Sequence, residues 1–153
     1  MSPDDGTDGP VLFAYDGSDQ AQGAIEQAGR QLQGDRKAIV LSVWEPLESV
    51  PFWGAPMSTV PAEMAEQVRD EAEKVAAEGA ERARQAGFDA EPAVVEGAPV
   101  WQGIVHAAEE EGAGIIVIGS HGRRGAAYLA MGSVATAVAH HSKIPVLICR
   151  LDS

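Results

Sequence analysis

Short apolar runs alternate with longer segments of mixed polarity along this chain. Runs with the length and the β-forming side chains of buried strands lie at 11–15, 38–44, 115–118 and 145–149. The run AIVLSVW at 38–44 is largely apolar rather than alternating, which is typical of a strand covered on both faces. A weaker run lies at 93–96. The pattern therefore predicts five strands, of which the third has the weakest signal.

The segments between these runs carry apolar residues at helical spacing. In the first segment, the residues that share one helix face are Ala21, Ala24, Ile25, Ala28 and Leu32. Four residues that favour the start of a helix mark the beginnings of the segments: Ser18, Pro61, Pro99 and Ser133. Glycines mark the ends of the first three: Gly34, Gly87 and Gly112. The segment 45–60 contains three prolines and is predicted to be an unusually long loop.

Strands that alternate with helices predict an α/β fold with a five-stranded parallel sheet and right-handed crossovers. We expect one doubly wound, Rossmann-like domain over residues 10–153, preceded by a disordered acidic tail over residues 1–9. In open sheets of this kind, ligands bind beyond the carboxyl ends of the strands, where the strand order reverses. This rule selects three places in the chain: Asp16-Gly17-Ser18, Val43 to Glu45, and the loop that opens at Gly119.

The stretch GSHGRRGAAYLAMGS, residues 119–133, joins the fourth strand to the fourth helix. Its glycines let the backbone approach a ligand closely, and exposed amides in such a loop or at a helix start attract anions. Arg123 and Arg124 add positive charge, and Ser133 adds a hydroxyl, so the residues together describe a phosphate site. The same glycines also suit tight turns and close strand–helix packing, and the pattern alone leaves both interpretations open. It matches neither the P-loop nor the dinucleotide fingerprint.

The charge balance narrows the range of partners. The 153 residues include 23 acidic and 11 basic side chains, for a formal net charge of -12. This balance disfavours nucleic acid and anionic membrane surfaces as partners. The single cysteine, Cys149, excludes an intramolecular disulfide. Because no apolar run is long enough to span a bilayer and the acidic N-terminus does not resemble a signal peptide, we expect a cytoplasmic protein.

A longer motif makes the chain recognisable. Gly119-Ser120-His121-Gly122 is followed by nine residues and then by Gly132-Ser133, which gives the spacing Gly-x2-Gly-x9-Gly-Ser. Asp16-Gly17-Ser18 follows the first strand, and Pro-Val-Leu-Ile stands at 145–148. In these features the sequence resembles the universal stress protein family, and in particular its ATP-binding members, from residue 11 to residue 150.

The resemblance implies strand order 3-2-1-4-5 and a homodimer that pairs through the last strand. It implies that Asp16 contacts the ribose of a bound nucleotide and that the main chain at Val43, with Ala14 beside it, contacts the adenine. The remaining candidates, which hold the phosphates and the ribose, are Gly119, His121, Gly122, Gly132, Ser133 and Val134. The implied ligand is ATP, with ADP or AMP as alternatives, accompanied by Mg2+.

Several of these residues have a simpler role open to them. Asp16 can stabilise its own turn, Ser18 can cap the first helix, and His121 can be a surface histidine. Two positions depart from the common family pattern. Gly114 stands where many members have an aspartate, and Tyr15 stands where a small or β-branched residue is frequent.

These features favour an ATP-binding regulator of the stress response. We expect at most slow hydrolysis, because no general base or transition-state cation can be named. The alternative is a dimeric interaction or chaperone-like module of the same fold that needs no nucleotide. A hydrolase is disfavoured because the Gly-x-Ser-x-Gly motif is absent.

Overall fold

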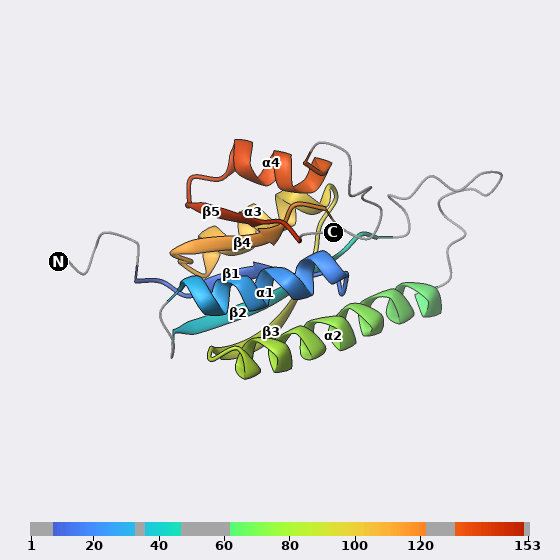
Figure 1. The fold of residues 1–153 in the computed structure, drawn as a ribbon. Coiled ribbons are helices and arrows are strands. Elements are labelled where there is room, and N and C mark those ends of the chain that lie inside the picture. The colour runs from blue at the N-terminus through green and yellow to red at the C-terminus, as the bar shows by residue number, and fades with distance from the viewer. Residues whose placement is uncertain (1–7, 33–35, 47–61, 122–130, 152–153) are drawn as a thin grey trace.

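Five parallel strands form one sheet, and four helices connect them in the described part of the chain (Figure 1). The computed structural model describes residues 8–32, 36–46, 62–121 and 131–151. The elements are β1 (Val11–Ala14), α1 (Asp19–Gln31), β2 (Lys37–Trp44), α2 (Ala62–Gln85), β3 (Asp89–Glu96), α3 (Val100–Glu110), β4 (Ile115–Gly119), α4 (Ser133–His141) and β5 (Val146–Cys149). The sheet order β3-β2-β1-β4-β5 confirms both the predicted fold and the strand order that the family resemblance implies.

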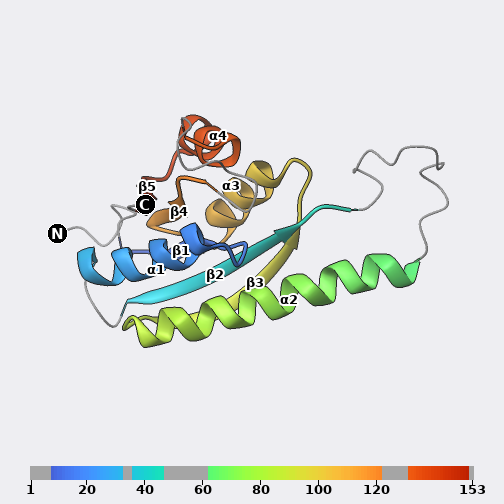
Figure 2. The same ribbon diagram turned by 45° about the vertical axis from the view of Figure 1, so that its right-hand side comes forward.

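Helices cover both faces of the sheet, and β1 lies at its centre (Figure 2). Side chains alternate along β1, so Val11 and Phe13 pack with α1 and α2, whereas Leu12 packs with α3 and α4. Phe13 meets Phe88 edge to face, with ring centroids 5.2 Å apart. Burial on both faces explains why the central strands are apolar throughout rather than alternating.

The edge strand β3 is longer than the sequence predicted. It runs from Asp89 to Glu96, whereas the apolar run covers only 93–96. Its first half is exposed apart from Ala90 and contains Pro92, which an edge strand tolerates because one side of it has no neighbour. Continuous pairing with β2, rather than burial, therefore defines the start of β3.

The helix boundaries follow the predicted capping residues closely. The hydroxyl of Ser18 accepts a hydrogen bond from the amide of Ala21 at 3.2 Å and so caps α1. Pro99 is the N-cap of α3 rather than its first residue, and α4 begins at Ser133 as predicted. The predicted start of the second helix at Pro61, the predicted stop at Gly34 and most of the loop 45–60 lie outside the described residues.

The first described residues pack beside the start of the sheet. Arg36 donates from Nη2 to the carbonyl of Gly9 at 2.9 Å. The backbone amide of Gly114 donates to the carbonyl of Pro10 at 3.0 Å and so joins the entries of β1 and β4. Residues 1–7, most of the predicted acidic tail, lie outside the described residues.

Candidate functional site

The candidate positions at the ends of β1, β2 and β4 lie together at the carboxyl end of the sheet. These three strands are neighbours and run in the same direction, so their carboxyl ends meet there (Figure 1). Asp16 follows β1 and its last residue Ala14, Val43 lies next to the end of β2, and Gly119 ends β4. After β1 the chain continues to β2 on one side of β1 in the sheet, and after β4 it continues to β5 on the other side. The strand order therefore reverses between β1 and β4. The fold thus brings together the three places that the sequence selected.

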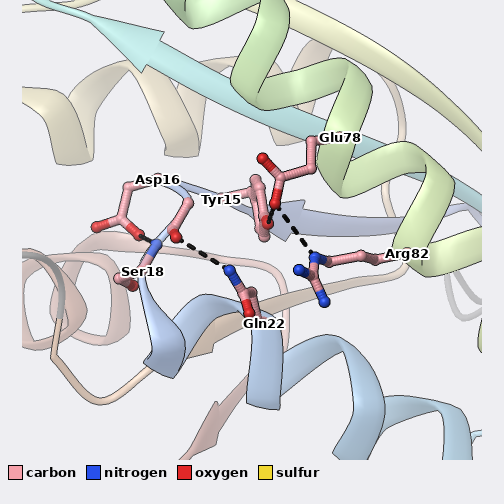
Figure 3. Close-up of polar contacts among 7 residues, drawn as sticks. Tyr15, Asp16, Ser18, Gln22, Glu78 and Arg82 are labelled. Carbon is pink, nitrogen blue, oxygen red and sulfur yellow. Dashed lines mark hydrogen bonds and ion pairs between the residues drawn. The ribbon is translucent and has the colours of Figure 1, made fainter.

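Asp16 stabilises the turn between β1 and α1. Its carboxylate accepts the amide of Ser18 at 3.0 Å, and the side-chain amide of Gln22 donates to the carbonyl of Gly17 at 3.2 Å (Figure 3). Gly17 has a φ of 80°, a conformation that favours glycine. The turn role that the sequence left open for Asp16 is therefore present, and its side chain is exposed at the surface of the edge.

Tyr15 packs into the core directly before this turn. Its side chain lies against Gly79 of α2, where a Cβ atom would come within 2.6 Å of both the Tyr15 ring and Val40. Its hydroxyl makes a long hydrogen bond of 3.4 Å to Glu78, which also pairs with Arg82 at 3.3 Å (Figure 3). Burial raises the pKa of the Tyr15 phenol, and the negative charge of Glu78 adds to the rise while Arg82 opposes it.

The end of β2 is held to β1 by a buried hydroxyl. Ser42 donates from Oγ to the carbonyl of Tyr15 at 2.9 Å and is only 4% exposed. The side chain of the next residue, Val43, lies toward Gly97 and Gly103, where added Cβ atoms would approach it to 2.9 and 3.0 Å. Glycines at these two positions therefore let the backbone beyond β3 and the first turns of α3 pack closely over Val43.

Two glycines of the motif have close-packing roles within the chain itself. A Cβ atom at Gly119 would lie 3.0 Å from the backbone of Gln20 in α1. One at Gly132 would lie 3.0 Å from the carbonyl oxygen of Ser120, to which the Gly132 amide donates at 2.7 Å. The structural interpretation that the sequence left open therefore holds for both. The remaining predicted loop residues, Gly122, Arg123 and Arg124, lie outside the described residues.

The first turn of α4 faces this edge with its amides. Gly132 is the N-cap, and no side chain in the described part of the chain caps the helix. Ser133 is exposed and Val134 is half-buried. Because the first amides of a helix have no partner within it, they form an anion-binding position.

His121 lies beside that helix start. Its Nδ1 is 3.1 Å from the hydroxyl of Ser120, and its ring carbon Cδ2 would be 3.8 Å from a Cβ atom at Gly132. Ser120 is buried, and its hydroxyl also makes a long hydrogen bond of 3.4 Å to Gln20, which accepts the amide of Leu151 at the same distance. This polar cluster links α1, the exit of β4 and the chain after β5.

Three further residues with titratable side chains, His140, His141 and Cys149, occupy structural positions. His140 and His141 end α4, and the ring of His141 stacks on Trp101 of α3 with centroids 4.2 Å apart. Cys149 is buried at the end of β5, and burial raises the pKa of its thiol. No helix in the described part of the chain combines the length and apolar character needed to cross a membrane.

The sequence did not indicate four residues that pack or make hydrogen bonds beneath the carboxyl end of the sheet: Ser42, Gly79, Gln20 and Ser120. Each acts through a partner far away in the sequence, such as Tyr15 for Ser42, 27 residues apart. A lone serine within an apolar run was the one available signal, because a buried hydroxyl needs a hydrogen-bond partner.

Known proteins resemble this chain over nearly its whole length. The model of a family described as "Universal stress protein family" matches residues 9–150. The universal stress protein YxiE of Bacillus subtilis (strain 168) is 30% identical over 154 residues, covering 92% of this chain and 97% of that protein.

Solved structures share the fold. The hypothetical protein MJ0577 superposes with a TM-score of 0.78 at 25% identity, covering 96% of this chain and 99% of that one. A universal stress protein in complex with cAMP superposes with a TM-score of 0.63 at 28% identity, covering 92% of this chain and 96% of that one.

Proposed function

Because the chain belongs to the universal stress protein family, we propose that it binds ATP at the carboxyl edge of the sheet and acts as a nucleotide-dependent regulator of the stress response. The observation that carries the proposal is the start of α4, where Gly132 caps the helix without a side-chain hydrogen bond and Ser133 is exposed. Its first-turn amides suit a phosphate group. The similar protein in complex with cAMP supports an adenine nucleotide as the ligand.

The roles follow from the position of each residue at the edge. The amides of Ser133 and Val134 bind phosphate, with His121 beside them, and Asp16 contacts the ribose. The main chain at Val43 contacts the base. Mg2+ enters with the nucleotide and is held chiefly by phosphate oxygens, since no three acidic, histidine or cysteine side chains cluster as a metal site among the described residues. We expect slow hydrolysis, because no general base can be named among the described residues.

A direct titration tests this function. Purified protein is freed of copurified nucleotide and titrated with ATP in a calorimeter, and the small molecules released on denaturation of untreated protein are identified by mass. We expect saturable binding of ATP and release of an adenine nucleotide. Absence of saturable binding contradicts the proposal.

A pair of variants at one position tests the phosphate contact. Ser133→Asp adds a negative charge at the first residue of α4, where an acidic side chain favours the helix but repels phosphate, and Ser133→Asn has nearly the same shape without the charge. We expect the dissociation constant for ATP to rise about tenfold or more in the aspartate variant relative to the asparagine variant. The melting temperature without nucleotide should not fall in the aspartate variant. Equal affinities would place the phosphates elsewhere.

The nucleotide-independent interaction module remains the second candidate. It is favoured by the packing roles of Gly119 and Gly132, which explain both glycines without a ligand. Under this alternative, Ser133→Asp leaves stress survival of the host cell unchanged, whereas a nucleotide switch loses its function in the same variant.

A further inference from the structure

The last hydrogen bond between β1 and β2 is made by a side chain. The amide of Tyr15 donates to the carbonyl of Leu41 at 2.9 Å, which continues the parallel pairing one residue beyond β1. Regular pairing would next join the carbonyl of Tyr15 to the amide of Val43. The hydroxyl of Ser42 takes that place, donating to the Tyr15 carbonyl at 2.9 Å.

The backbone of Val43 faces the β1 side of β2. The amide of Gly97, beyond β3, donates to the carbonyl of Trp44 at 3.0 Å, so Trp44 directs its backbone groups toward β3. Backbone groups alternate in direction along a strand, and Leu41 and Val43 therefore direct theirs the other way. Within the described residues, no backbone amide donates to the Tyr15 carbonyl, so the Val43 amide has not taken up this pairing.

The residue that bears this carbonyl is held on both sides, by its amide, which donates to Leu41, and by its side chain. The Tyr15 ring is buried against Gly79 and Val40, with no room for even a Cβ atom at Gly79. A buried carbonyl needs at least one donor, and here the Ser42 hydroxyl supplies it while the Val43 amide, the donor that regular pairing would use, does not.

We infer that Ser42 is a positioning residue for base recognition, because its hydroxyl satisfies the Tyr15 carbonyl and leaves the Val43 amide to the base. This inference rests on the proposed function. The N–H and C=O of Val43 point to the same side of the strand and together offer one donor and one acceptor. Adenine matches this pair with its N1 acceptor and its 6-amino donor. Guanine presents the opposite order at the same edge, with an N1–H donor and an O6 acceptor, so Val43 rejects it.

An experiment without nucleotide isolates the role of the hydroxyl. Ser42→Thr and Ser42→Val have the same shape and differ only in the hydroxyl, so each is the control for the other. Hydrogen exchange of the Val43 amide is followed by NMR in the nucleotide-free protein. We expect similar exchange in wild type and Ser42→Thr, and at least tenfold slower exchange in Ser42→Val, where the amide regains the Tyr15 carbonyl. Equal exchange rates in the two variants would overturn the inference.

Nucleotide binding by the same variants tests recognition itself. We expect Ser42→Thr to keep the wild-type dissociation constant for ATP within about twofold, and Ser42→Val to raise it about tenfold, equivalent to about 1.4 kcal/mol. The preference for ATP over GTP should fall in Ser42→Val alone. A loss that is the same for both nucleotides, or equal ATP affinity in the two variants, overturns the positioning role. No ATP binding by wild type and Ser42→Thr overturns the proposed function, while the exchange experiment still reports on Ser42.

Discussion

Gly132 serves the fold and the candidate phosphate site at once. Its own amide donates to Ser120 at 2.7 Å and is therefore not available to a phosphate. Its missing side chain keeps the helix start close to the exit of β4, since a Cβ atom would press on the Ser120 carbonyl. The motif glycine therefore acts through its small size, and the amides that remain for an anion belong to Ser133 and Val134. A spacing motif in sequence does not distinguish these two contributions.

The Tyr15 phenol leads to a prediction about alkaline stability. Its pKa is raised in the folded protein, first by burial and then by Glu78, so the fold favours the neutral phenol. This contribution to stability is complete below the pKa of the unfolded chain, about 10, and is lost as pH rises through the folded pKa. Urea unfolding at a series of alkaline pH values should show that the free energy of unfolding falls more steeply with pH in wild type than in Tyr15→Phe. Parallel curves would show that the phenol ionises as easily in the folded state as in the unfolded one.

At the scale of elements, α2 is placed by a glycine that helix propensity disfavours. Gly79 lies inside the 24-residue helix and lets it approach the Tyr15 ring and Val40. Alanine would improve the intrinsic helix propensity by about 1 kcal/mol, and overpacking a core costs about 1–3 kcal/mol. Because the Cβ atom would come within 2.6 Å of two buried side chains, the packing term should be the larger one.

Gly79→Ala is therefore expected to destabilise the protein by up to about 2 kcal/mol despite its better helix propensity. Chemical denaturation measures the change. The informative control is the same substitution in a Tyr15→Val background, where the ring is gone and part of the cost should disappear. Additive effects of the two substitutions would mean that the ring does not set the position of α2.

Individual elements also show where sequence reasoning reaches its limit. Apolar runs identified β1, β2, β4 and β5, because strands covered by helices on both faces consist largely of apolar residues. The first half of β3 was missed, since Asp89 to Pro92 is exposed apart from Ala90 and is defined by its pairing with β2. At the site, Asp16, Val43 and Gly119 could be placed from the rule on carboxyl ends. Ser42 and Gly79 could not, because each depends on Tyr15, which is distant in sequence and becomes a neighbour only when the sheet forms.

At the scale of the whole molecule, the two edges of the sheet differ in their protection against pairing. The edge strand β3 carries Pro92 and exposed acidic residues, devices that discourage a second chain from adding to a sheet. The opposite edge, β5, has the sequence VLIC, with no charge and no proline. This asymmetry favours β5 as the surface for the homodimer that the family resemblance implied.

A substitution on β5 tests that dimer. Ile116 donates to Pro145 and Ser120 donates to Cys149, so by alternation the Ile148 amide faces outward. Ile148→Pro removes this amide without breaking a bond to β4, and Ile148→Ala is the control that loses packing but keeps the amide. Sedimentation equilibrium should give twice the 16.0 kDa chain mass for wild type. The average mass should be lower for Ile148→Pro than for Ile148→Ala. A wild-type monomer at all concentrations would exclude this dimer.

The central position of β1 has a consequence for how the chain acquires its site. β1 is the first strand to be synthesised, yet its partner β4, paired through Val11 and Ile115, comes last but one. Closing so long a stretch of chain is entropically costly and makes the pairing a slow, late step in folding. A nascent chain therefore carries the Asp16 turn for most of its synthesis without the helix start that completes the candidate site, and the side of β1 that pairs with β4 stays without its partner strand until then.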